Sequence, residues 1–341
     1  MLEHKKRQVH IACVGKTYIT VFNNEVIENL QKALLAEAKK EPTNGAYGLC
    51  SNQIQTIYTS FYSNNLEKYD AIHQNYFAYK MMELPSLEEK RVGIMILSKN
   101  IEELGVDNIK DFERIFDDDI TEWTICDLFA TKILSVLIKK SDPFTTEICK
   151  WKECDKTWRL RAICIAFVSL AKVQVMTDLC FDICKSVLKS SERFVQLGIG
   201  CLLREMSITM SDKLVEFIKE NYRYFIREGL RYSIDKLPTK TRKEILSYNT
   251  KRRNNKSEND EDDGNDMNEN DIREPAQIQP NNQSVMGQSM NYSNFPIQPV
   301  YVDMNYYNPN NMMYESIKQD RTQNMYTQST IPLPSNMQNL K

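Results

Sequence analysis

The chain has 341 residues, a formal net charge of −2 and 41% hydrophobic residues. All nine Cys and all three Trp precede Glu205, whereas residues 249–341 contain 18 Asn and only two Leu. A tail of this composition cannot bury enough apolar surface to offset the entropy of folding, which excludes it as a second globular domain. We therefore predict an N-terminal extension (1–24), a folded domain (25–248) and a disordered tail (249–341).

Apolar residues recur at the helical spacing from Glu25 to about Leu246, and the alternation typical of a strand is confined to Val9–Phe22. The predicted helices cover Val26 to near Lys40, Asn52–Ser63, Leu66–Met82, Leu87–Glu103, Ile109–Phe116, Glu122–Lys140, Thr145–Glu153, Thr157–Leu170, Val175–Lys189, Ser191–Ser207, Asp212–Asn221, Ile226–Leu237 and Lys240–Ser247. Short connections separate these helices, and Pro85 and Pro238 each stand at a break.

Short helices that follow one another in pairs, at about 35–45 residues per pair, are typical of HEAT-type solenoids. We therefore predict an all-α fold, an α-solenoid of HEAT-like helix pairs followed by the disordered tail. A strict repeat motif is not visible in the sequence. A globular helical bundle is the structural alternative.

Membrane and metal-binding proteins are both disfavoured by the sequence. The longest apolar run, Ala162–Ala171, is too short to span a bilayer and is followed at once by Lys172. No two Cys form a CxxC pair, and the only histidines are His4, His10 and His73. We therefore expect buried free thiols in a reducing compartment, with no metal site, no cofactor and no membrane partner.

Positive charge gathers in the C-terminal third of the predicted domain. Residues 187–256 contain 16 Lys/Arg and eight Asp/Glu, and an acidic run, Glu258–Asp271, follows directly. Such a region suits a polyanion, although chance clustering on a solvated helix face is an equal alternative. Four of the basic residues recur every fourth position, and would form a stripe for a phosphate backbone if the helix were continuous. These four are Lys219, Arg223, Arg227 and Arg231.

Three residues stand out for their chemistry. Trp123 and Asp127 are four positions apart in one predicted helix, so the indole and the carboxylate share a face. The carboxylate could stabilise a cationic transition state beside an aromatic wall, as in cleavage of an N-glycosidic bond; alternatively, Trp123 belongs to the core and Asp127 caps or solvates a neighbour. Arg161, at the start of a buried helix, could hold a phosphate or pair with an acid on an adjacent helix.

Four segments, in this order, resemble successive signatures of the DNA alkylation repair glycosylases, the AlkD-like HEAT-repeat proteins. They are Trp123–Asp127 (WTICD), Thr157–Ile163 (TWRLRAI), Arg193–Glu205 (RFVQLGIGCLLRE) and Ile226–Tyr232 (IREGLRY). The resemblance covers roughly residues 26–246.

The resemblance implies a concave, positively charged solenoid that holds duplex DNA and excises N3- or N7-alkylated purines without a deep pocket for a flipped base. Asp127 would stabilise the deoxyribosyl oxocarbenium ion and orient the attacking water, with Trp123 packed near the lesion. The remaining implied site residues serve two purposes. Arg161, Arg159, Arg227 and Arg231 would bind DNA phosphates, and Trp123, Trp158 and Cys201 would line the lesion cleft. We expect the protein to act as a monomer on double-stranded DNA.

One position departs from the family pattern. Cys201 stands where the family typically has a tryptophan, and a thiol lacks the contact area of an indole, whose stacking is worth about 1–3 kcal/mol. The substitution predicts an activity that is weakened, shifted in substrate or lost. We interpret the neighbouring Arg204 and Glu205 as a structural ion pair or interhelical clamp.

Two other functions are compatible with this sequence. One is a non-catalytic member of the same family that binds DNA structures or a protein partner, and the other is a scaffold for protein interactions. Lys251–Arg253 and Lys256 form a short basic run that could serve as a nuclear-import signal, so we expect a nuclear or nucleocytoplasmic protein.

Overall fold

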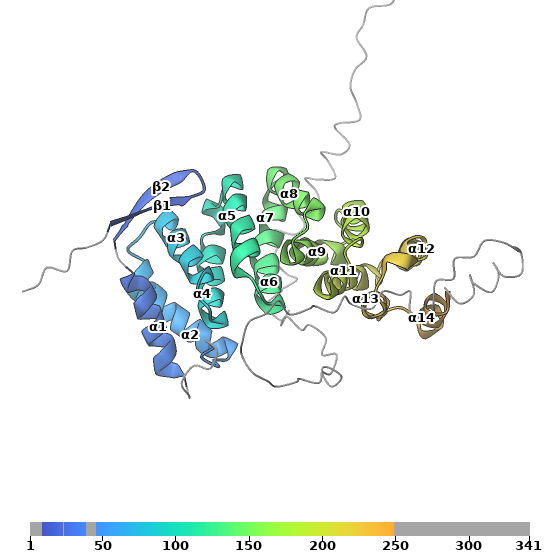
Figure 1. Cartoon of the computed structure of the whole chain (residues 1–341), viewed down its shortest axis with the longest axis horizontal. Helices are drawn as coiled ribbons and strands as arrows, with labels where there is room; N and C mark the ends of the chain where they lie inside the picture. The colour runs from blue at the N-terminus through green and yellow to red at the C-terminus, as the bar shows by residue number, and fades with distance from the viewer. Residues whose placement is uncertain (1–8, 23, 39–45, 249–341) are drawn as a thin grey trace, which may run out of the picture. The chain divides into compact units, whose positions relative to one another are not determined.

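The computed structural model describes residues 9–22, 24–38 and 46–248 (Figure 1). Its elements are β1 (Val9–Val14), β2 (Thr17–Phe22), α1 (Glu25–Glu37), α2 (Ser51–Phe61), α3 (Ala71–Met82), α4 (Leu87–Lys99), α5 (Ile109–Arg114), α6 (Trp123–Phe129), α7 (Ser135–Lys140), α8 (Asp142–Cys149), α9 (Thr157–Lys172), α10 (Thr177–Val187), α11 (Arg193–Met206), α12 (Ser211–Asn221), α13 (Arg227–Ser233) and α14 (Thr239–Leu246). This confirms the predicted all-α, solenoid-like fold. The predicted tail and its basic run lie outside the described residues.

The segment with strand-like alternation forms an antiparallel hairpin of β1 and β2, in which Val9 pairs with Phe22 and Val14 with Thr17. Gly15 occupies the turn at a φ of +60°, which glycine adopts without a Cβ clash. Its N–H donates to the carboxylate of Asp111 in α5 at 2.8 Å. The hairpin also packs against α3. Residues 9–22, predicted as part of an extension, therefore pack onto the helices.

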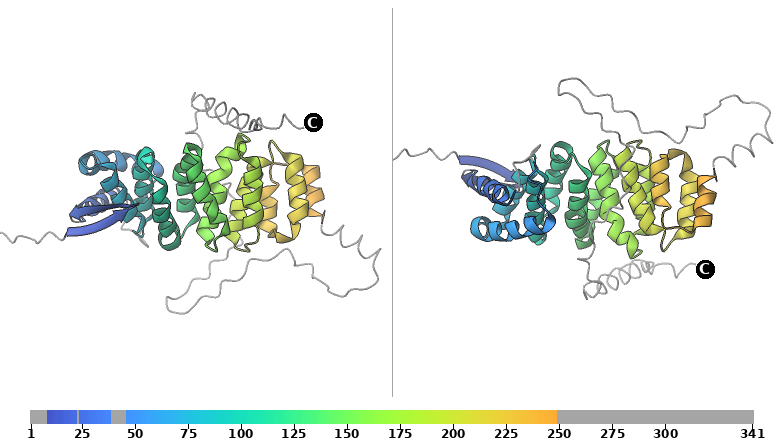
Figure 2. Two further views of the ribbon diagram at one scale, coloured as in Figure 1. Left: turned by 90° about the horizontal axis from the view of Figure 1, so that it is seen from above. Right: turned by 90° about the horizontal axis from the view of Figure 1, so that it is seen from below.

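Successive helices lie next to one another in chain order from α1 to α14 (Figure 2). Five of them, α4, α6, α9, α11 and α13, contact one another in that order, and we call these the central row. Helix α10 packs against α9 and α11 from outside this row. Helices α6, α9, α11 and α13 of this row carry the four sequence segments described above, apart from Ile226, which directly precedes α13.

The predicted helix Glu122–Lys140 is divided by a π-helical turn, Ala130–Leu134, into α6 and α7. The hydroxyl of Thr131 donates to the Asp127 carbonyl at 2.8 Å within this turn. A π-helical turn inserts one extra residue and shifts every later side chain around the helix axis. The apolar spacing alone did not reveal this change of register.

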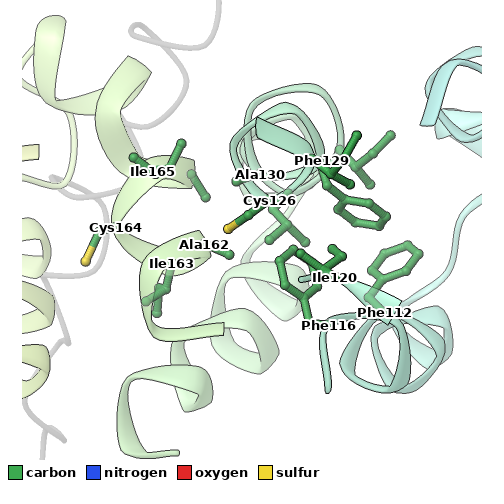
Figure 3. Packing of buried hydrophobic residues seen from close by; sticks show 14 of the residues in the cluster. Phe112, Phe116, Ile120, Cys126, Phe129, Ala130, Ala162, Ile163, Cys164 and Ile165 are labelled. Atoms are coloured by element: carbon green, nitrogen blue, oxygen red, sulfur yellow. The ribbon is translucent and has the colours of Figure 1, made fainter. Parts of the chain in front are cut away.

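Aromatic side chains fill the core between α5 and α6 (Figure 3). Phe129 meets the rings of Phe112 and Phe116 edge to face, each at a centroid distance of 5.2 Å. Trp151, which is 1% exposed, adds a third contact to Phe116 at 5.1 Å. These edge-to-face contacts, together with the buried area, fix the C-terminal end of α6 against its neighbours.

Two buried glutamines repeat the same hydrogen bond in distant parts of the chain. The Gln74 side-chain amide donates to the Leu66 carbonyl at 3.1 Å, and that of Gln196 donates to the Leu188 carbonyl at 3.2 Å, in each case eight residues earlier. Gln196 also donates to the carbonyl of Tyr224 at 3.1 Å, which ties the start of α11 to the segment before α13. The shared bond is a structural trace of repetition that no sequence motif showed.

Candidate active site

Asp127 and Arg161 form a buried ion pair where α6 crosses α9. The Nε of Arg161 donates to Oδ1 of Asp127 at 2.8 Å, and its Nη2 donates to Oδ2 at 2.7 Å. The two residues are 1% and 3% exposed. Of the two alternatives left open for Arg161 by the sequence, the structure shows pairing with an acid on an adjacent helix.

The third nitrogen of Arg161 connects the pair to α11. Its Nη1 donates to the carbonyl of Phe194 at 2.8 Å. Helix α11 approaches closely because it carries Gly198 at the crossing, where a Cβ would lie 3.2 Å from Cγ of Arg161 and 3.4 Å from its Cα. Three helices of the central row therefore meet at this one guanidinium group.

Lys90 fixes the segment that leads into α6. Its ammonium group is buried in α4 and donates to the carbonyls of Met82 and Asp119, the latter at 2.9 Å. Burial lowers the pKa of Lys90, and the nearby carboxylate of Asp119 opposes that shift. Because Asp119 lies four residues before Trp123, this contact sets the position at which α6 begins.

The electrostatics of the pair combine burial with strong attraction. Burial raises the pKa of Asp127, while the charge and hydrogen bonds of Arg161 act in the opposite direction. Removing two charges from water is expensive, and apolar residues of similar volume often stabilise a fold as well as a buried pair does. A buried ion pair beside the apolar run of α9 is therefore not explained by stability alone. It is a good candidate for a functional site.

The tryptophans differ in their surroundings. Trp151 belongs to the core, and its indole N–H donates to Glu113 at 3.0 Å. Trp158 is half-buried and stacks obliquely on Phe194, with ring centroids 5.3 Å apart. Trp123 is half-buried at the first residue of α6 and does not belong to the hydrophobic core cluster of the described residues. The indole nearest in sequence to Asp127 is thus partly accessible from solvent.

Cys201 lies in α11, half-buried, beside the ion pair. Burial raises the pKa of its thiol to about 11, and the charge of Asp127 adds to that shift. Burial also raises the pKa of Tyr232 in α13, and the Cys201 thiol adds to that shift. From α6 to α13, four successive helices of the central row therefore each supply one residue to this site: Asp127, Arg161, Cys201 and Tyr232.

The model of the DNA alkylation repair enzyme family matches residues 25–237. The chain belongs to this family. Its role is therefore in the repair of alkylated DNA, and DNA is the substrate that the family acts on. All site residues named above lie within the matched region.

One similar solved structure is a predicted DNA alkylation repair enzyme from Enterococcus faecalis. It is 15% identical in sequence to this protein, with a TM-score of 0.49, and the alignment covers 64% of this chain and 97% of the other. A comparison with functionally curated proteins gives no significant match.

The arginines predicted to bind phosphate in this family member fall into two groups. Arg159 pairs with Asp117, with Nε 2.9 Å from Oδ1, and with Glu113, at 3.2 Å. Arg161 is held by Asp127 as described. In both cases acids on preceding helices neutralise the guanidinium, which the sequence did not show because the partners are distant along the chain.

Arg227 and Arg231 differ, since both are exposed on α13 and, within the described residues, form no ion pair. Arg231 lines a cavity of about 330 Å³ together with Arg242 and Lys243. The predicted break after Asn221 is present, because the backbone becomes extended at Ile226 (φ −76°, ψ 152°) and separates α12 from α13, so Lys219 does not continue a stripe with these two arginines. Positive charge nevertheless remains available at this end of the central row.

The predicted ion pair between Arg204 and Glu205 is confirmed. Nη1 of Arg204 lies 3.3 Å from Oε1 of Glu205, which is 6% exposed and also receives Nζ of Lys236 at 2.7 Å. Asp235 holds Nε of Arg204 at 3.1 Å. These contacts join the C-terminal end of α11 to the segment after α13, as an interhelical clamp.

In the described part of the chain, no group of three or more His, Cys, Asp or Glu side chains is arranged to hold a metal ion. No helix in that part is both long and apolar enough to cross a membrane. Tyr232 is the last residue of the segment Ile226–Tyr232, but nothing in the sequence distinguishes it as a site residue.

Proposed function

We propose that this protein is a DNA N-glycosylase that hydrolyses the bond between deoxyribose and an N3- or N7-alkylated purine in duplex DNA. The proposal rests on family membership and on one observation, the buried Asp127–Arg161 pair one helical turn from the half-buried indole of Trp123. The roles proposed below for the other site residues all depend on this pair.

The chemistry asked of the protein is limited. A purine alkylated at N3 or N7 carries a positive charge and departs as a neutral base, so the reaction does not depend on a general acid. Positive charge instead develops on the deoxyribose as the bond breaks. A preorganised carboxylate next to that charge stabilises the transition state, and the same carboxylate can orient the water that attacks the sugar.

Arg161 has two roles in this proposal. At rest it keeps the buried Asp127 ionised, since its charge opposes the effect of burial on the carboxyl pKa. When DNA binds, a backbone phosphate competes for the guanidinium, which favours such bidentate contacts. Each N–H that turns towards phosphate leaves a carboxylate oxygen of Asp127 available to the sugar or the water. The pair thus couples DNA binding to exposure of the catalytic charge.

Of the two aromatic residues of α6, Trp123 is the one that remains partly exposed, since Phe129 is fully buried. Because it is only half-buried, its ring can pack on the sugar–phosphate of the lesion nucleotide without displacing core residues. Contacts of this kind between an aromatic ring and a nucleotide are worth about 1–3 kcal/mol.

Release of free base tests the proposal directly. Full-length protein is incubated with duplex DNA containing 7-methylguanine or 3-methyladenine, and released base and abasic sites are counted. Asp127→Asn should reduce release at least 100-fold, since it removes the charge that stabilises the transition state. Asp178→Asn, on the exposed face of α10, is the matched control and should behave as wild type. No release by wild type, or equal release by Asp127→Asn, would overturn the proposal.

A second function is favoured by a specific observation. Both carboxylate oxygens of Asp127 are engaged by Arg161, and the residue is almost fully buried. If the pair does not open on DNA, the protein is a DNA-binding member of the family without catalysis. Salt-dependent duplex binding, unchanged in Asp127→Asn and without base release, would establish this function instead.

A further inference from the structure

Tyr232 lies directly against the backbone of α11. A Cβ placed on Gly200 would meet Cδ1 of Tyr232 at 2.9 Å and its Cβ at 3.2 Å, distances that real Cβ contacts essentially never or rarely show. The carbonyl of Gly229, in the same helix as Tyr232, would lie 3.1 Å from that Cβ. Only glycine at position 200 lets the ring approach so closely.

Arg204, another residue of α11, also contacts the ring. Its guanidinium lies 5.5 Å from the Tyr232 ring centroid. Arg204 is itself fixed by Glu205 and Asp235. The ring is therefore held at its edge and over its π-system, so little rotational entropy is left to lose on binding.

This preorganised ring is not buried as core tyrosines are. Tyr79, whose hydroxyl accepts a hydrogen bond from Asn108 in the core, is 4% exposed, and Tyr222 is 6% exposed. Tyr232 retains intermediate exposure although Gly200 and Arg204 of α11 contact it. Its contact point on α11, Gly200, is two residues from Gly198, which abuts Arg161 of the ion pair.

We infer that Tyr232 is a positioning residue of the proposed glycosylase, whose ring packs against the deoxyribose of the lesion nucleotide and holds it over the Asp127–Arg161 pair. The inference rests on the proposed function. Cys201 contributes to this position of Tyr232, because its small side chain leaves room for the Tyr232 hydroxyl next to α11. A bulky side chain at position 201 would compete with Tyr232 for that space.

The kinetic test compares Tyr232→Phe, Tyr232→Leu and Tyr232→Ala with wild type in the base-release assay. Loss of an aromatic contact of about 1–3 kcal/mol predicts a decrease in kcat/KM of roughly 5- to 150-fold for Tyr232→Leu and Tyr232→Ala. Tyr232→Phe keeps the ring and should remain within about threefold of wild type. The matched control is Tyr224→Ala, since Tyr224 is also half-buried beneath an arginine, Arg223 at 4.7 Å, but lies outside the site.

A binding measurement keeps this inference separate from the proposed function. Fluorescence anisotropy compares an undamaged duplex with one that carries a tetrahydrofuran in place of one nucleoside, which presents the sugar without a base. Tyr232→Leu should lose affinity for the tetrahydrofuran duplex about 10-fold and keep that for the undamaged duplex, whether or not wild type releases base. Equal affinities of Tyr232→Leu and wild type for the tetrahydrofuran duplex, or equal losses for both duplexes, would overturn the inference.

Discussion

Arg161 donates to both carboxylate oxygens of Asp127, at 2.8 and 2.7 Å, across the contact between α9 and α6. The same guanidinium donates to the Phe194 carbonyl of α11 at 2.8 Å. One side chain thereby joins three helices of the central row. These three helices are held together by the guanidinium of Arg161, whose charge is neutralised by Asp127.

The coupling between these two residues can be measured as free energy. Arg161→Met leaves a buried carboxylate without its partner, so we expect a loss of about 3–5 kcal/mol in the free energy of unfolding. The double variant Asp127→Leu, Arg161→Met removes both charges and should regain most of that loss. Urea unfolding at neutral pH gives the free energies of unfolding of wild type, the single variants Asp127→Leu and Arg161→Met, and the double variant, which together form the double-mutant cycle. Additive losses would show that the pair is not coupled.

Base release should depend on pH through Asp127. Burial raises the pKa of this carboxyl, so protonation, which removes the catalytic charge, begins at a higher pH than for an ordinary aspartate near 4. Activity should therefore fall as the pH is lowered. Arg161→Gln removes the charge that opposes the shift, so its acid limb should move to higher pH still. Rates are corrected for spontaneous depurination without enzyme, and coincident limbs would contradict the assignment.

A methyl group at position 200 should disturb both the fold and the site. In Gly200→Ala the new Cβ meets Tyr232 and the Gly229 carbonyl, and we expect a loss of about 1–3 kcal/mol in the free energy of unfolding. Gly105→Ala is the control, since the nearest atom to its Cβ, Oδ1 of Asn108, is 3.9 Å away. That variant should lie within about 0.5 kcal/mol of wild type. Thermal or urea unfolding distinguishes the two, and equal stabilities would argue against the close contact.

Thiol reactivity should divide the cysteines sharply. Cys13 and Cys50 are exposed, whereas burial raises the pKa of Cys149 and Cys201 to about 11 and that of Cys180 to about 12. At neutral pH these three are almost entirely protonated, and only the thiolate reacts. Titration of the native protein with a disulfide reagent should modify two thiols quickly and the other seven of the nine only after unfolding. Rapid reaction of more than two would show that the helices open easily.

DNA affinity should depend on Arg227 and Arg231 far more than on Arg159. The first two are exposed on α13, while Asp117 and Glu113 already neutralise Arg159. The double variant Arg227→Gln, Arg231→Gln should reduce the slope of log affinity against log salt by about 2. Arg159→Gln should leave that slope unchanged. Anisotropy titrations of one duplex at several salt concentrations measure both slopes, and a reversed order would assign the phosphate contacts to α9 instead.

Periodicity and motif spacing were sufficient to predict most helices, including the one that carries Trp123 and Asp127, and to place strand-like alternation at Val9–Phe22. They did not predict that this segment forms a hairpin packed on the helices. They could not identify the partner of Arg161, because that partner lies 34 residues earlier and is set by how two helices pack. The π-helical turn after Asp127 was missed for a related reason, since one inserted residue barely alters an apolar pattern. Tyr232 was missed because its contacts depend on the absence of a side chain at Gly200.

The buried amide of Gln196 has a consequence for cooperativity. In an array of stacked helices the units nearest an end open most easily, and each opening normally stops at the next interface. Gln196 bonds the carbonyls of Leu188 and Tyr224 and accepts the N–H of Ile226, so the start of α13 cannot separate without disturbing α11. Fraying that reached α13 would then loosen the helix whose Phe194 carbonyl steadies Arg161. The integrity of the Asp127–Arg161 pair is thereby linked to the hydrogen bonds of Gln196, which does not contact the pair.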